Sequence, residues 1–171
     1  MIPSAEAAPG SLLFESVARP LLLLHATLGF TAVGATTHLA VYSWLAARGR
    51  RHSAALRRFG WIAPAAVVSQ VLLGLVLYPT YRVRVRALHL DHESPLVAQL
   101  FDFKEHLAAL SVALVLGAAL VARLRPDESA GQHGAQVTQA TAALSITAAA
   151  LVWTVALIGL WVTAVHPVGL P

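Results

Sequence analysis

Four long stretches without charged side chains constrain this chain more than any other feature. Residues 21–47, 59–81, 106–122 and 140–165 contain no Asp, Glu, Lys or Arg. A helix needs about 20 mainly apolar residues to cross the hydrocarbon core of a bilayer. The chain is also 57% hydrophobic and only 12% charged, a composition too apolar for a soluble domain. The sequence therefore predicts an all-α integral membrane protein, a bundle of four transmembrane helices.

Local signals set the expected ends of these helices. Pro20 and the pair Ser94-Pro95 are typical of helix starts, because proline is well tolerated in the first turn and serine caps it. We expect helices at about residues 20–48, 59–82, 95–124 and 137–166, in a single membrane domain that comprises residues 1–171. Residues 82–93 are expected to form a polar connection.

Composition excludes several kinds of site. The chain has no cysteine, and its one methionine is the first residue, so thiolate metal sites, iron–sulfur clusters and covalently attached c-type haem are excluded. Histidine is left as the strong nitrogen ligand. The calculated pI near 10.3 reflects arginines beside apolar stretches, so we expect the lipid bilayer as partner and no nucleic acid.

The charged residues are distributed unevenly between the two expected sides. The side with the connections 48–58 and 123–136 has seven basic residues and two acidic ones: Arg48, Arg50, Arg51, Arg57, Arg58, Arg123 and Arg125 against Asp127 and Glu128. The opposite side has five basic residues and six acidic ones: Arg19, Arg82, Arg84, Arg86 and Lys104 against Glu6, Glu15, Asp91, Glu93, Asp102 and Glu105. By the positive-inside rule, we expect a bacterial inner-membrane protein with both termini on the outer face.

Four histidines lie within or at the end of the predicted helices: His25, His38, His106 and His166. Ionisable groups inside a bilayer are costly, so they are candidates for function. Helix rise places His25 and His106 in the outer half, on two different helices. We expect these two to share one cofactor or metal site, with His38 and His166 as further candidate ligands.

Asp102 and Glu105 are the carboxylates expected to support this site. Asp102 precedes His106 by four residues and shares its helix face, where it can orient the imidazole, raise its proton affinity or form part of a proton path. Ala109, Ala113 and Gly117 continue this face, and small residues allow a flat macrocycle or another helix to approach. The alternative is that the charged residues are solvated at the level of the lipid headgroups.

His38 has a structural alternative. His25 and His38 are 13 residues apart, which on an ideal helix is a rotation of about 220°, so two haems stacked on one face are not expected. Gln70 of the second helix has a similar estimated depth to His38. We therefore predict that Gln70 is the hydrogen-bond partner of His38 if His38 is not a ligand.

The helix count and histidine placement resemble membrane four-helix b-type cytochromes. The resemblance implies haem b held by His25, His38 and His106, and electron transfer with quinone or with a redox partner at the outer face. One alternative is an accessory or assembly subunit of a larger membrane complex. Another is a proton or metal-ion pathway through the histidines and carboxylates.

Overall fold

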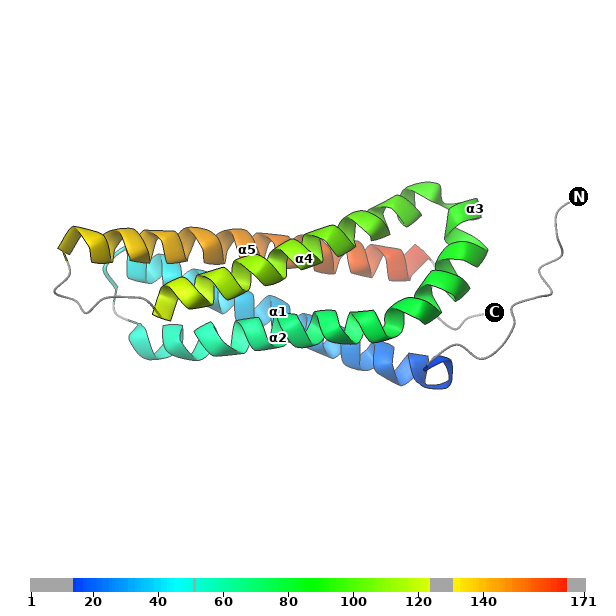
Figure 1. Ribbon diagram of the computed structural model, residues 1–171, viewed down its shortest axis with the longest axis horizontal. Coiled ribbons are helices and arrows are strands. Elements are labelled where there is room, and N and C mark those ends of the chain that lie inside the picture. The colour runs from blue at the N-terminus through cyan, green and yellow to red at the C-terminus, as the bar shows by residue number, and fades with distance from the viewer. Residues whose placement is uncertain (1–13, 51, 124–130, 166–171) are drawn as a thin grey trace, which may run out of the picture.

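The computed structural model describes residues 14–50, 52–123 and 131–165, and all the regular structure in these residues is helical. A short 3-10 turn, η1 (Glu15–Val17), leads into α1 (Ala18–Ala47), which is followed by α2 (Ser53–Tyr81). A π-helix, η2 (Arg82–Leu90), and a turn, α3 (Asp91–Glu93), then lead to α4 (Pro95–Arg123) and α5 (Gly131–Val165). The four long helices lie side by side (Figure 1). The predicted all-α four-helix bundle is confirmed.

Within the described residues, four helices are long and apolar enough to cross a membrane: Ala18–Ala47, Ser53–Glu93, Pro95–Arg123 and Gln132–Val165. Their outward faces carry large apolar side chains. Four leucines have exposed fractions of 57% to 63%: Leu72, Leu75, Leu157 and Leu160. Such a surface fits lipid, where an exposed leucine has no hydration cost to avoid.

Small residues fill the interior where the helices cross. Ala32, Ala35, Ala63 and Ala148 are almost fully buried in one core cluster with Val115. Small side chains let helix backbones approach closely, which is the usual way in which membrane helices pack. A second core cluster, which includes Val85, Leu90 and Phe101, lies where η2 meets α4.

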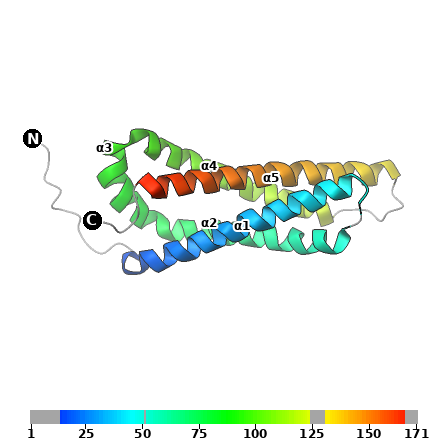
Figure 2. The same ribbon diagram turned by 180° about the vertical axis from the view of Figure 1, so that it is seen from behind.

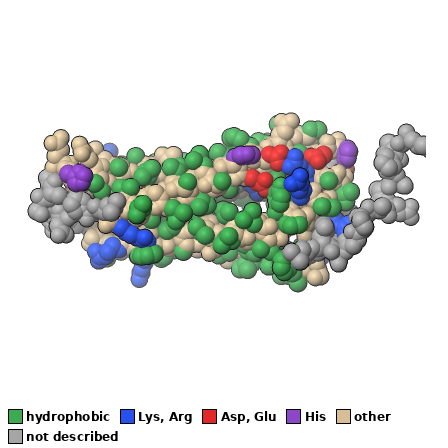
Figure 3. Space-filling model, in the orientation of Figure 1, with side chains coloured by type: hydrophobic (Ala, Val, Ile, Leu, Met, Phe, Trp, Pro, Cys, Tyr) green, Lys and Arg blue, Asp and Glu red, His purple; other side chains and the backbone are tan. Residues whose placement is uncertain are grey.

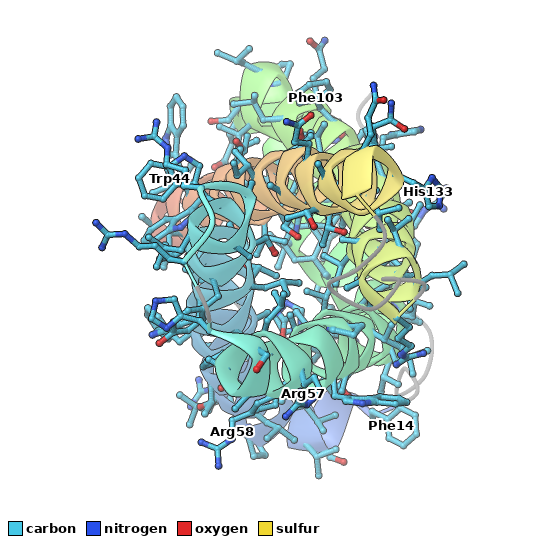
Figure 4. The ribbon with its side chains drawn as sticks, turned by 90° about the vertical axis from the view of Figure 1, so that its left-hand side faces the viewer. Phe14, Trp44, Arg57, Arg58, Phe103 and His133 are labelled. Carbon is cyan, nitrogen blue, oxygen red and sulfur yellow. The ribbon has the colours of Figure 1, made fainter. Side chains whose placement is uncertain are left out.

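Each long helix packs chiefly on two neighbours. α1 lies against α2 and α5, and α4 lies against α5 and α2. Seen along the bundle, the long helices form a ring (Figure 4), and seen from behind, α1 runs between α2 and α5 (Figure 2). The start of α1, the end of α5 and the η2–α3 segment share one end of the bundle. The α1–α2 turn lies at the other end, together with the end of α4 and the start of α5.

Two helix starts and one connection differ from expectation. α2 begins at Ser53 and α5 at Gly131, each about six residues before its expected start. Residues 82–93, expected to be a polar connection, are helical instead. They contain neither proline nor glycine, so nothing in the backbone stops the helix until Ser94, which precedes Pro95 and has an extended φ of −147°.

Candidate functional site

A hydrogen bond between His25 and Gln70 links α1 to α2 inside the bundle. Gln70 Nε2 lies 3.0 Å from His25 Nε2. The amide nitrogen can only donate, so this imidazole nitrogen accepts and, in the neutral ring, the hydrogen is on Nδ1. His25 Nδ1 and Gln70 Oε1 are both buried and have no hydrogen-bond partner among the described residues.

Two glycines make room for this pair. A Cβ atom on Gly74 would lie 3.2 Å from His25 Cε1, and a Cβ atom on Gly29 would lie 3.2 Å from Gln70 Nε2. Real Cβ contacts are rarely this short. The polar side chains therefore occupy space that larger residues at positions 29 and 74 would take.

Lys104 and Tyr81 extend the polar interior toward the η2 end. Lys104 Nζ lies 4.4 Å from the centre of the Phe101 ring, and the half-buried Glu105 follows it on α4. The Tyr81 ring also stacks on the Phe101 ring, with 4.1 Å between ring centres, and its buried hydroxyl has no partner among the described residues. We call His25, Gln70, Tyr81 and Lys104 the interior polar cluster.

Arg86 binds the carboxylate that was expected to assist His106. Arg86 Nη2 donates to Asp102 Oδ2 at 2.9 Å, and Arg86 Nη1 donates to Asp102 Oδ1. Arg86 Nε also donates to Asp91 Oδ1 at 3.4 Å. This two-pronged pairing joins η2 to α4. Charged side chains accordingly gather over this end of the bundle (Figure 3).

His106 lies on the outside of α4 and is exposed. Its Nδ1 lies 2.8 Å from the backbone carbonyl oxygen of Asp102. A carbonyl oxygen only accepts, so Nδ1 donates, and in the neutral ring Nε2 keeps a free lone pair. The carboxylate of Asp102 therefore does not orient His106, although the backbone of the same residue does.

His38 has the same arrangement on α1. It is exposed, and its Nδ1 donates to the carbonyl oxygen of Gly34 at 2.7 Å. Its ring stacks on Phe59 of α2, with 4.8 Å between ring centres. In the neutral ring its Nε2 also keeps a free lone pair.

The prediction that Gln70 is the partner of His38 is wrong, because Gln70 donates to His25. Gln70 and His38 would have similar depths only if the second helix began next to Arg58, whereas Arg58 lies inside α2, which begins at Ser53. Counted from the ends of the helices, Gln70 and His38 differ in height by about 12 Å, whereas Gln70 and His25 differ by about 8 Å. Phe59 is the residue that lies opposite His38.

The two histidines expected to share a site lie in different environments. His25 contacts α2 in the interior, whereas His106 is exposed, and no hydrogen bond or ring contact in the described chain joins them. The described residues contain no group of three or more His, Cys, Asp or Glu that could hold a metal ion. His166 lies outside the described residues.

Lys104 and Arg86 are the residues whose place in the site was not predicted. The buried residues Val97, Phe101, Ser111 and Val115 mark the inner face of α4. Lys104 follows Phe101 by three residues and so lies near this face, whereas His106 does not. Once the buried face of α4 is known, the helical spacing of the residues places Lys104 near that face.

No family model, curated protein or solved structure matches this chain.

Proposed function

We propose that this chain is a subunit of a larger membrane electron-transfer assembly and that His106 is an axial ligand of haem b on the outward face of α4. The observation that carries the proposal is the state of the His106 ring. Its Nδ1 hydrogen is donated to a backbone carbonyl, and its Nε2 lone pair is free on an exposed surface. Metal-binding histidines almost always donate their other ring N–H in this way.

The surface beside His106 suits a flat group. Ala109 and Ala113 are exposed on the same face of α4, and a Cβ atom added to Gly117 would meet nothing within 4 Å. Small residues allow a macrocycle or a partner helix to lie close to the backbone. A haem needs only two axial ligands. A cluster of three or more His, Cys, Asp or Glu, which the described residues do not contain, is therefore not required.

The second axial ligand comes from a partner subunit in this proposal. An exposed imidazole in a membrane-spanning helix is costly unless another group covers it, and His106 and His38 are both exposed. His38 is the second candidate ligand of this chain, because its Nε2 is also free. His25 is not a ligand here, since Gln70 occupies its Nε2.

The proposed electron transfer takes place near the outer face, with quinone or a redox protein as the exchange partner. This placement rests on the arginine asymmetry, which favours an inner membrane with the η2 end outside. The interior disfavours a continuous proton or metal-ion pathway. Among the described residues, those that are buried and polar between the interior polar cluster and the α1–α2 turn are Thr36, Ser43, Ser111, Thr141 and Ser145, none of them ionisable, in a core of alanine, valine and leucine.

Optical spectra of the assembly, isolated in mild detergent from its native membrane, test the proposal. We expect reduced b-type bands with dithionite, and we expect His106→Ala to abolish them. His92→Ala is the matched control, because His92 is an exposed histidine at the same end of the bundle. His25→Ala should also keep the bands.

Two results would contradict the proposal. Full haem content in His106→Ala together with His38→Ala would show that neither exposed histidine is a ligand. A colourless assembly in which a photoreactive residue at position 109 cross-links to another subunit would instead support the accessory role. An assembly that is colourless and in which position 109 forms no cross-link would contradict both roles.

A further inference from the structure

Five exposed arginines surround the end of the bundle at the α1–α2 turn, and we call them the arginine rim. They come from the end of α1, the start of α2 and the end of α4: Arg48, Arg50, Arg57, Arg58 and Arg123. The view onto this end shows Arg57 and Arg58 projecting outward from the start of α2, with Trp44 on a different side of the bundle (Figure 4).

The rim differs from the opposite end in how its charges are paired. Arg86 is bound by Asp102 and Asp91, and Arg82 donates to the Tyr78 hydroxyl at 3.3 Å. Within the described ranges, no rim arginine forms an ion pair. Five guanidinium groups therefore face outward at this end without a carboxylate from the described chain.

Two tryptophans indicate where the rim lies relative to the boundary between hydrocarbon and headgroups. Arg48 lies over the Trp44 ring at 4.4 Å, and Arg123 of α4 lies over the Trp61 ring of α2 at 3.6 Å. Both rings are exposed, Trp44 by 42% and Trp61 by 65%. Tryptophan prefers the boundary between hydrocarbon and headgroups, so guanidinium groups stacked on these rings lie at the level of lipid phosphates.

We propose that the arginine rim binds the phosphodiester groups of anionic lipids in the adjacent leaflet. A guanidinium group is a planar fork of donors that matches two phosphate oxygens. Anionic headgroups also supply the charge that the described chain lacks here, and each arginine near such a surface strengthens binding roughly fivefold. This site is separate from the proposed haem face, so either proposal can fail without the other.

Quenching of Trp44 and Trp61 by brominated lipid tests the rim. A Trp153→Phe, Trp161→Phe background leaves these two as the reporters, since the chain has four tryptophans. The protein is reconstituted in phosphatidylcholine that contains a small fraction of brominated phosphatidylglycerol or brominated phosphatidylcholine. We expect the anionic lipid to quench more strongly at equal mole fraction, and added salt to weaken this preference.

Arg57→Gln combined with Arg58→Gln removes two rim charges and leaves both stacked Arg–Trp pairs in place. We expect it to lower the preference for phosphatidylglycerol roughly 25-fold, and we expect Arg57→Lys with Arg58→Lys to keep most of it. Arg82→Gln is the matched control at the opposite end and should have no effect. Equal quenching by the two lipids in the reporter background would overturn the proposal. So would loss of the preference on addition of inorganic phosphate at an ionic strength at which sodium chloride leaves the preference intact, since that result would indicate a site for free phosphate.

Discussion

Within the described chain, the side chains of His25 and Gln70 form a hydrogen bond with each other and with no other group. His25 Nε2 has Gln70 Nε2 at 3.0 Å, and the remaining polar atoms of the pair, His25 Nδ1 and Gln70 Oε1, are buried without a partner in the described chain. A buried polar group that loses its only partner costs about 1–3 kcal/mol, whereas replacing both partners by apolar groups is nearly neutral. The pair should therefore behave as one unit in mutagenesis.

We predict that Gln70→Leu lowers the free energy of unfolding by about 1–3 kcal/mol, because it leaves His25 Nε2 buried and unpaired. His25→Leu in the Gln70→Leu background should restore most of this loss. Unfolding in mixed detergent micelles measures each variant. A double variant whose loss equals the sum of the two single losses would show that the two side chains do not interact.

Gly74 provides a steric test of the packing around His25. We predict that Gly74→Ala destabilises the bundle by about 1–3 kcal/mol through overpacking, because its Cβ atom would lie 3.2 Å from the His25 ring. Gly60→Ala on the same helix meets nothing within 4 Å and should be neutral or slightly stabilising, since alanine favours helix over glycine. Equal effects of the two substitutions, measured by thermal unfolding, would contradict the close packing of His25 on Gly74.

At the scale of elements, η2 is the least regular part of the bundle. π-Helices are rare and are frequently found at functional sites, and this one spans Arg82–Leu90. Val85 and Leu90 bury its apolar face against Val97 and Phe101. On the polar face, Arg86 ties η2 to α4 through Asp102. Packing and one bidentate ion pair together hold this segment over the start of α4.

We predict that Asp102→Asn speeds hydrogen exchange of the amides in η2, because it removes the carboxylate that Arg86 binds with two donors. The effect on global stability should be small, up to about 1 kcal/mol, since both side chains are partly exposed to solvent (25% and 41%). Asp91→Asn is the control, because Asp91 makes a single longer contact of 3.4 Å to Arg86. Unchanged exchange in Asp102→Asn would mean that apolar packing alone holds η2.

At the scale of the whole molecule, the two ends carry different electrostatics. At the η2 end, Arg86 binds carboxylates and Arg82 donates to a tyrosine hydroxyl, whereas the rim arginines at the opposite end form no ion pair within the described chain. The core of small residues between them separates the interior polar cluster from the rim. The orientation proposed for the membrane follows from this asymmetry.

Single-cysteine labelling tests that orientation. The chain has no native cysteine, so Ala54→Cys near the α1–α2 turn and His92→Cys in α3 each introduce one thiol at an exposed position. We predict that a membrane-impermeant reagent labels position 92 in intact cells and labels position 54 only after permeabilisation. The reverse pattern would invert the topology and move the proposed electron transfer to the other face.

Much of the fold was predictable from sequence because its cause is local. Runs of uncharged residues long enough to cross a bilayer must hydrogen-bond their own backbone, and a helix is the simplest way to do so. The helix count and Pro95 as the start of α4 followed from this. The start of α2 and the helical conformation of residues 82–93 were not predicted from the sequence, because polar residues without proline or glycine do not end a helix.

The sequence by itself therefore determined the membrane-spanning character of this protein and its number of long helices. It also determined the uneven charge of the two ends and histidine as the strongest type of metal ligand. Only the tertiary structure decided which histidine faces which neighbour. His25 is inside and bound to Gln70, while His38 and His106 are outside with Nδ1 donated to their own helix. The physical reason is that helices apolar on every side carry almost no periodic signal for their buried face, so rotation and register are set by close packing between helices.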